Sequence, residues 1–109
     1  MKEIQACGFT LIVTVNFYDD TLEPGELFVN IAKQGSTISG FVDALVTTIS
    51  IALQHGVPWE VLRNKYVDHK FEPSDGVNPS LVHAIAVAVD NLIQVKKDLW
   101  DSDGTKNVP

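Results

Sequence analysis

The sequence has one cysteine, Cys7, among 109 residues. A single cysteine cannot form an intramolecular disulfide or a cysteine-based zinc site. The three histidines, His55, His69 and His83, lie far apart and form no His-x-x-x-His pair, so we expect no metal centre. We therefore expect no cofactor, and we interpret Cys7 as a small apolar residue on a strand.

Basic residues are scarce. The chain has 8 lysines and arginines against 14 aspartates and glutamates, for a formal net charge of −6. A protein that coats a nucleic-acid polymer needs a basic face, so this class is excluded. A small anionic ligand needs only a local cluster of positive charge and remains compatible with the composition.

Long hydrophobic runs are also absent. No uninterrupted apolar stretch reaches the length of a transmembrane helix, and the first five residues lack the apolar run of a signal peptide. With 45% apolar and 20% charged residues, the composition is that of a globular domain. We expect one cytoplasmic domain over residues 1–100, without membrane contact, and a polar tail over 101–109.

The hydrophobic pattern predicts an α+β fold, with an antiparallel β-hairpin followed by three helices. Residues 8–18 and 26–32 alternate with period two, and the turn-forming residues 19–25 separate them. A lone hairpin exposes two strand edges. Either the helices suffice to cover it, or a second subunit extends the sheet; we favour the second, and therefore a homo-oligomer.

Three segments have the features of helices. The first runs from Ser36 or Thr37 to about His55, because Gly56 suits a left-handed helix end and Pro58 prevents continuation. The second starts with Pro58 in its first turn and covers residues 59–66. The third runs from an Asn78–Pro79 start to about residue 100. The first carries one charge, Asp43, so we expect it to be buried on almost every side. A chain of this size has little material to bury it, which again favours self-association.

The start of the first helix is a candidate anion site. Helix N-termini present unpaired N–H groups and a partial positive charge, and Lys33, Gly35, Ser36 and Thr37 lie there. The spacing is not that of a Walker loop. The alternative is that Ser36 or Thr37 merely caps the helix.

A second basic group comprises Arg63, Lys65, His69 and Lys70. Arg63 is the sole arginine, and arginine is well suited to bidentate contact with phosphate. The alternative is a solvated helix face.

Three aromatic residues are candidates for stacking on a nucleobase. They are Trp59, Tyr66 and Phe71. Packing in the core is the alternative for each.

No set of residues indicates catalysis. Asp43 and Asp90 lie among apolar neighbours, but no nucleophile–base pair accompanies them. We interpret both as structural residues bonded to serine, threonine or backbone groups, and we expect no enzyme.

Residues 8–74 carry a series of motifs in a characteristic order. They are 14–19 (Thr-Val-Asn-Phe-Tyr-Asp), 24–29 (Pro-Gly-Glu-Leu-Phe-Val), 32–40 (Ala-Lys-Gln-Gly-Ser-Thr-Ile-Ser-Gly), 50–58 (Ser-Ile-Ala-Leu-Gln-His-Gly-Val-Pro) and 70–73 (Lys-Phe-Glu-Pro). The series resembles the TSCPD-type domain near the C-terminus of adenosylcobalamin-dependent (class II) ribonucleotide reductases. The Thr-Ser-Cys-Pro-Asp signature itself, the radical cysteines, the cobalamin site and the cysteine-rich redox tail have no counterpart here.

The resemblance implies an accessory domain on its own, which cannot reduce ribonucleotides. Our first functional hypothesis is a non-catalytic domain that senses or sequesters a nucleotide or a nucleotide-derived signal, held by Lys33, Gly35, Ser36, Thr37, Arg63 and Lys70. The alternative is a structural module that docks on a ribonucleotide reductase or on another protein.

Overall fold

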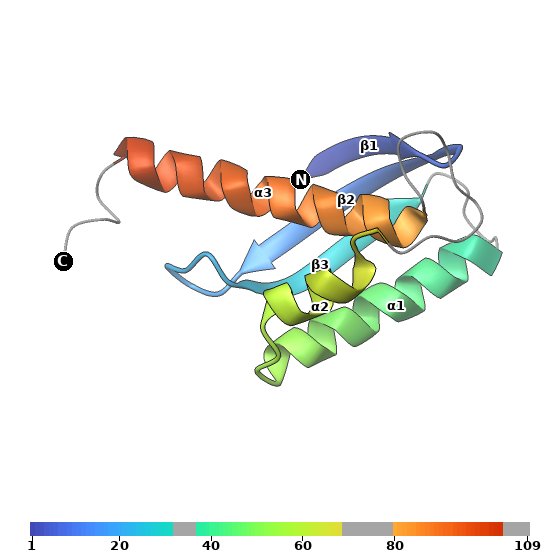
Figure 1. Cartoon of the computed structure of the whole chain (residues 1–109), viewed down its shortest axis with the longest axis horizontal. Coiled ribbons are helices and arrows are strands. Elements are labelled where there is room, and N and C mark those ends of the chain that lie inside the picture. The colour runs from blue at the N-terminus through green and yellow to red at the C-terminus, as the bar shows by residue number, and fades with distance from the viewer. Residues whose placement is uncertain (32–36, 69–79, 104–109) are drawn as a thin grey trace.

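The fold is a three-stranded antiparallel sheet followed by three helices (Figure 1). The computed structural model describes residues 1–31, 37–68 and 80–103. For residues 101–103 it describes the backbone alone. The elements in chain order are β1 (Lys2–Ala6), β2 (Phe9–Phe17), β3 (Pro24–Ile31), α1 (Thr37–Gln54), α2 (Trp59–Tyr66) and α3 (Leu81–Asp103). The α+β class, the hairpin of β2 and β3, and the three helices confirm the prediction from the sequence.

Strand β1 is the element that the sequence pattern did not predict. It pairs with β2 from Lys2 opposite Val13 to Ala6 opposite Phe9. A two-residue turn joins the strands, with φ of 53° at Cys7 and 84° at Gly8. Positive φ at both positions is the pattern of a type I′ hairpin turn. Cys7 is buried as expected, but it lies in this turn and not on a strand, because its left-handed backbone reverses the chain.

One face of the sheet forms the core. Alternate residues of β2 and β3 are buried there, and both α1 and α3 pack on this side. The buried strand residues are Leu11, Val13, Leu27, Val29 and Ile31. The opposite face carries polar side chains together with Phe28, which is 49% exposed, and no described helix covers it.

Helix α1 ends with a Schellman motif, as the Gly56 and Pro58 signals predicted. The N–H of Val57 donates to the carbonyl of Ala52 at 3.0 Å, and the N–H of Gly56 to that of Leu53 at 3.1 Å. Gly56 adopts φ of 92°, which is the left-handed conformation this motif requires.

The burial of α1 differs from the sequence-based expectation. Five of its 18 residues are buried, namely Val42, Val46, Ile49, Ser50 and Leu53. Asp43 is exposed, and so is Phe41, at 72%. The prediction that α1 is buried on almost every side is therefore wrong for the single chain, because the sheet covers one side of it and leaves the other open.

By length and composition, α1 could cross a membrane, and it is the one such helix in the described part of the chain. The sequence has no uninterrupted apolar stretch of this length, but serine and threonine interrupt the helix and leave it apolar on average. The apolar core helices of globular domains meet the same criterion. In this fold α1 packs along β3.

Helices α2 and α3 begin close to the predicted positions. Pro58 is the N-cap residue of α2 and has extended backbone angles. We expected it one position later, in the first turn of the helix. Ser80 caps α3, because its Oγ accepts the N–H of His83 at 3.1 Å. Asn78 and Pro79, our predicted start, lie outside the described residues. Helix α3 continues to Asp103, three residues into the segment that we expected to be a tail.

Candidate functional site

The predicted anion site lies at the start of α1. This helix starts at Thr37, and its first turn contains no acidic side chain that would neutralise its N–H groups. Lys33, Gly35, Ser36 and Lys70 lie outside the described residues.

Helix α3 likewise has no acidic residue in its first turn. Along the long axis of the molecule, α1 and α3 begin at the same end (Figure 1). The tertiary fold therefore brings two positive helix ends to one region, which the sequence pattern alone did not indicate.

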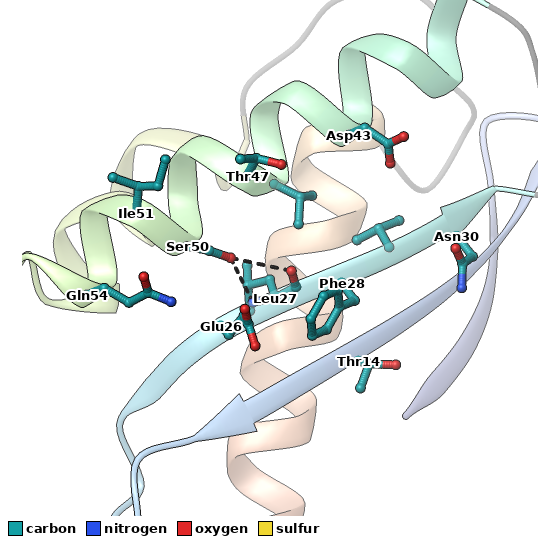
Figure 2. A pocket seen from close by; sticks show the side chains of 12 residues that line it. Thr14, Glu26, Leu27, Phe28, Asn30, Asp43, Thr47, Ser50, Ile51 and Gln54 are labelled. Atoms are coloured by element: carbon teal, nitrogen blue, oxygen red, sulfur yellow. Dashed lines mark hydrogen bonds between the residues drawn. The ribbon is translucent and has the colours of Figure 1, made fainter.

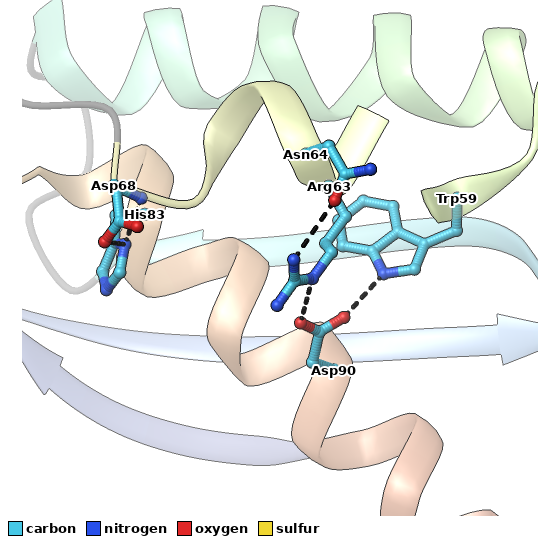
Figure 3. A network of polar contacts seen from close by, with 6 residues as sticks. All are labelled: Trp59, Arg63, Asn64, Asp68, His83 and Asp90. Carbon is cyan, nitrogen blue, oxygen red and sulfur yellow. Dashed lines mark hydrogen bonds and ion pairs between the residues drawn. The ribbon is translucent and has the colours of Figure 1, made fainter. Parts of the chain in front are cut away.

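Arg63, the other described member of the predicted site, is held by an acidic partner (Figure 3). Its Nε donates to Oδ2 of Asp90 on α3 at 2.8 Å, and its Nη1 donates to Oδ1 of Asn64 at 3.2 Å. The hydrogen bond and the charge of Asp90 raise the pKa of Arg63 above its ordinary value. The ion pair balances the positive charge that we expected to meet a phosphate.

Trp59 completes this network. Its Nε1 donates to Oδ1 of Asp90 at 2.9 Å, so one carboxylate joins two side chains of α2 (Figure 3). Trp59 is 8% exposed and packs in the core. Core packing is the alternative to base stacking that we gave for this residue. Tyr66 also packs against the core, and Phe71 lies outside the described residues.

Asp90 is structural, as expected, but its partners are not the serine, threonine or backbone groups that we predicted. Trp59 and Arg63 are four residues apart on α2 and so share one face of the helix. That spacing was a signal for a common partner, and sequence reasoning missed it.

His55 and His83 are the two histidines in the described part of the chain, and each has its own local surroundings. Nδ1 of His83 accepts the backbone N–H of Asp68 at 2.7 Å, and His55 lies just beyond the end of α1. His69 lies outside the described residues. Within 1–31, 37–68 and 80–103, no group of three potential metal ligands comes together.

A groove of about 660 Å³ lies between α1 and β3 (Figure 2). Side chains from both elements line it, and Thr14 of β2 lies at its margin. They include Glu26, Phe28 and Asn30 from β3, and Asp43, Thr47, Ser50, Ile51 and Gln54 from α1. Thr37 and Arg63, the two described residues that we singled out for phosphate binding, do not line this groove, whereas Asp43 does.

Ser50 closes part of the strand edge inside the groove. Its Oγ accepts the N–H of Leu27 at 3.0 Å and donates to the carbonyl of Leu27 at 3.4 Å (Figure 2). A side chain thus satisfies main-chain groups that another strand would otherwise use. Extension of the sheet along β3 is therefore blocked at Leu27, and β1 forms the other edge of the sheet.

Comparison with known proteins gives a consistent family match. The TSCPD domain model matches residues 1–93. A vitamin B12-dependent ribonucleotide reductase of Rhodopirellula baltica is 51% identical over 59 residues, which cover 54% of this chain and 6% of that protein. Its counterpart from Streptomyces clavuligerus is 39% identical over 83 residues, which cover 75% of this chain and 8% of that protein.

A reductase of the same name from Streptomyces coelicolor is 44% identical over 83 residues, again covering 75% of this chain and 8% of that protein. The chain thus spans less than a tenth of the length of each of these three relatives, and the remainder of those proteins has no counterpart in this sequence. No solved structure matches.

Proposed function

The chain belongs to the TSCPD domain family, and from that premise we propose that it is a non-catalytic module that binds a nucleotide or a nucleotide-derived signal molecule. The observation that carries the proposal is the convergence of the starts of α1 and α3 at one end of the molecule, with no acidic side chain in either first turn. The names of the relatives, as ribonucleotide reductases, support the ligand class by analogy.

The two helix starts supply N–H groups and partial positive charge suited to phosphate. In the proposed site, Gly35, Ser36 and Thr37 bind phosphate oxygens, and Lys33 and Lys70 neutralise them. Arg63 stays a proposed phosphate ligand, and its charge is shared with Asp90. Arg63 also ties α2 to α3, and Lys33 is the decisive cation.

The test is a binding measurement on the Lys33→Ala variant. Isothermal titration with nucleoside mono- and triphosphates and a cyclic dinucleotide should show binding to the wild type. A charge-assisted hydrogen bond contributes about 1.5–3 kcal/mol, so affinity should fall about tenfold or more. Lys97→Ala, near the far end of α3, is the matched control and should bind like the wild type. Equal affinity of all three proteins, or no binding to any, contradicts the proposal.

A docking or self-association role is the second candidate, and the open side of α1 favours it. Phe41 is 72% exposed and Ile51 is 52% exposed, and both lie on a helix whose one charged residue is Asp43. Large apolar side chains that recur along one helix face typically mark a protein interface. In this alternative a second copy of the chain covers α1 and forms the predicted homo-oligomer, or a reductase or another protein does.

Phe41→Asp is expected to shift the protein from oligomer to monomer in sedimentation velocity, because it places a charge in the proposed interface. Val61→Asp is the matched control, since Val61 is 52% exposed on α2. This control should sediment like the wild type. A monomeric wild type, or the same shift in both variants, would show that the open side of α1 does not join copies of the chain.

A further inference from the structure

We propose that the groove between α1 and β3 binds an extended segment of a partner protein that carries lysine or arginine side chains. The groove lies along the flank of α1, from Asp43 to Gln54, and is separate from the proposed nucleotide site at Thr37 (Figure 2). Its volume of about 660 Å³ suits a short peptide or a compact ligand. Three properties of its walls select among occupants: charge, main-chain hydrogen bonding and apolar contact.

The charge of the groove is negative. Glu26 of β3 and Asp43 of α1 line it, and none of the twelve lining residues in the described part of the chain is lysine, arginine or histidine. Glu26 accepts one hydrogen bond, from Nδ2 of Asn16 at 3.4 Å, and Asp43 is exposed. A phosphate in this groove would meet two carboxylates and no cation, whereas ammonium or guanidinium groups would be attracted.

The main chain of β3 can pair with an extended segment. In an antiparallel sheet the hydrogen-bonding groups of successive residues point alternately to one neighbour and to the other. Because Ser50 bonds the N–H and the carbonyl of Leu27, these two groups point away from β2. Val29 is two residues further along β3, so its N–H and carbonyl also point away from β2. No described residue outside the sheet bonds the main chain of Val29. Val29 is 6% exposed and lines the groove, and among the described residues its outward main-chain groups remain available to a partner by β-strand addition.

Apolar side chains flank this edge. Phe28 of β3 is 49% exposed and Ile51 of α1 is 52% exposed, and both belong to the residues that line the groove (Figure 2). The methylene groups of lysine or arginine can pack on such surfaces while the charged end reaches a carboxylate. A cation over the ring of Phe28 gains a further favourable contact. An extended basic segment satisfies all three properties together.

The test uses fluorescence anisotropy with a labelled pentapeptide of alternating lysine and valine, at an ionic strength of about 0.15 M. The double variant Glu26→Gln with Asp43→Asn should bind about tenfold more weakly than the wild type, the loss expected from about 1.4 kcal/mol. The matched double variant, Glu60→Gln with Asp98→Asn, makes the same change in net charge at exposed positions and should bind within about twofold of the wild type.

Two further peptides test the remaining properties. A pentapeptide with glutamate in place of lysine should not bind, and one N-methylated at its valines should lose affinity because it cannot donate to the strand edge. Equal weakening by both double variants would mean general attraction to an acidic protein and would overturn the proposal. So would absence of binding by the wild type. A change in oligomeric mass confined to the groove variant would assign the groove to a second copy of the chain.

Discussion

Replacing Trp59 with alanine is expected to destabilise the fold by about 3–5 kcal/mol, the usual loss for a large buried aromatic side chain. Trp59 packs in the core at the start of α2 and donates to Asp90 of α3. The change therefore opens a cavity and removes one of the two bonds that hold Asp90 to α2 (Figure 3). Urea unfolding followed by circular dichroism measures the loss.

Two companion variants separate packing from hydrogen bonding. Trp59→Phe keeps an aromatic ring but loses the Nε1 donor, so its loss should be clearly smaller than that of Trp59→Ala. Val61→Ala, at an exposed position of the same helix, should stay within about 0.5 kcal/mol of the wild type. If Trp59→Ala is no more destabilising than Val61→Ala, α2 does not depend on the core as the structure indicates.

Leu11→Ala is the second large effect, expected at about 2–5 kcal/mol. Leu11 is fully buried on the central strand, where it lies opposite Ile4 of β1 and Ile31 of β3. Truncation leaves a void beneath the helices that neighbouring strands cannot easily close. Thermal and urea unfolding should both report it.

Ile12, the next residue on β2, is the matched control for Leu11. It is half-buried on the uncovered face of the sheet, so Ile12→Ala should cost less. Equal losses at the two positions would contradict the assignment of the covered face. A greater loss at Ile12 would mean that its face is buried by a partner in solution.

Most of the fold was predictable because it follows from local chemistry. Period-two alternation indicated β2 and β3, and Gly56 with Pro58 indicated the end of α1. Strand β1 was missed because it is short and half polar, and its turn lacks the usual Asn-Gly signal. Cys7 occupies a left-handed position that asparagine or glycine usually fills. Without that signal, residues 2–6 offered too weak a pattern to be assigned.

The candidate site was less predictable than the fold. The residue type of Arg63 predicted a phosphate ligand. Its partner Asp90 is 27 residues away in the sequence, and no local pattern indicates that Nε of Arg63 lies 2.8 Å from Oδ2 of Asp90. Similarly, composition indicated that α1 is apolar but not which of its sides the sheet covers. The groove and its two carboxylates lie where α1 packs against β3, and Ser50 bonds the two elements there.

The sequence by itself determined the secondary-structure elements of the hairpin and helices, the acidic balance and the family. These depend on periodicity, turn chemistry and residue type, all of which act over a few neighbouring positions. Only the tertiary structure decided which charges are paired, where a side chain bonds the edge of β3, and at which end of the molecule α1 and α3 begin. Those outcomes depend on distances between segments far apart in the chain, and packing of the whole core sets these distances.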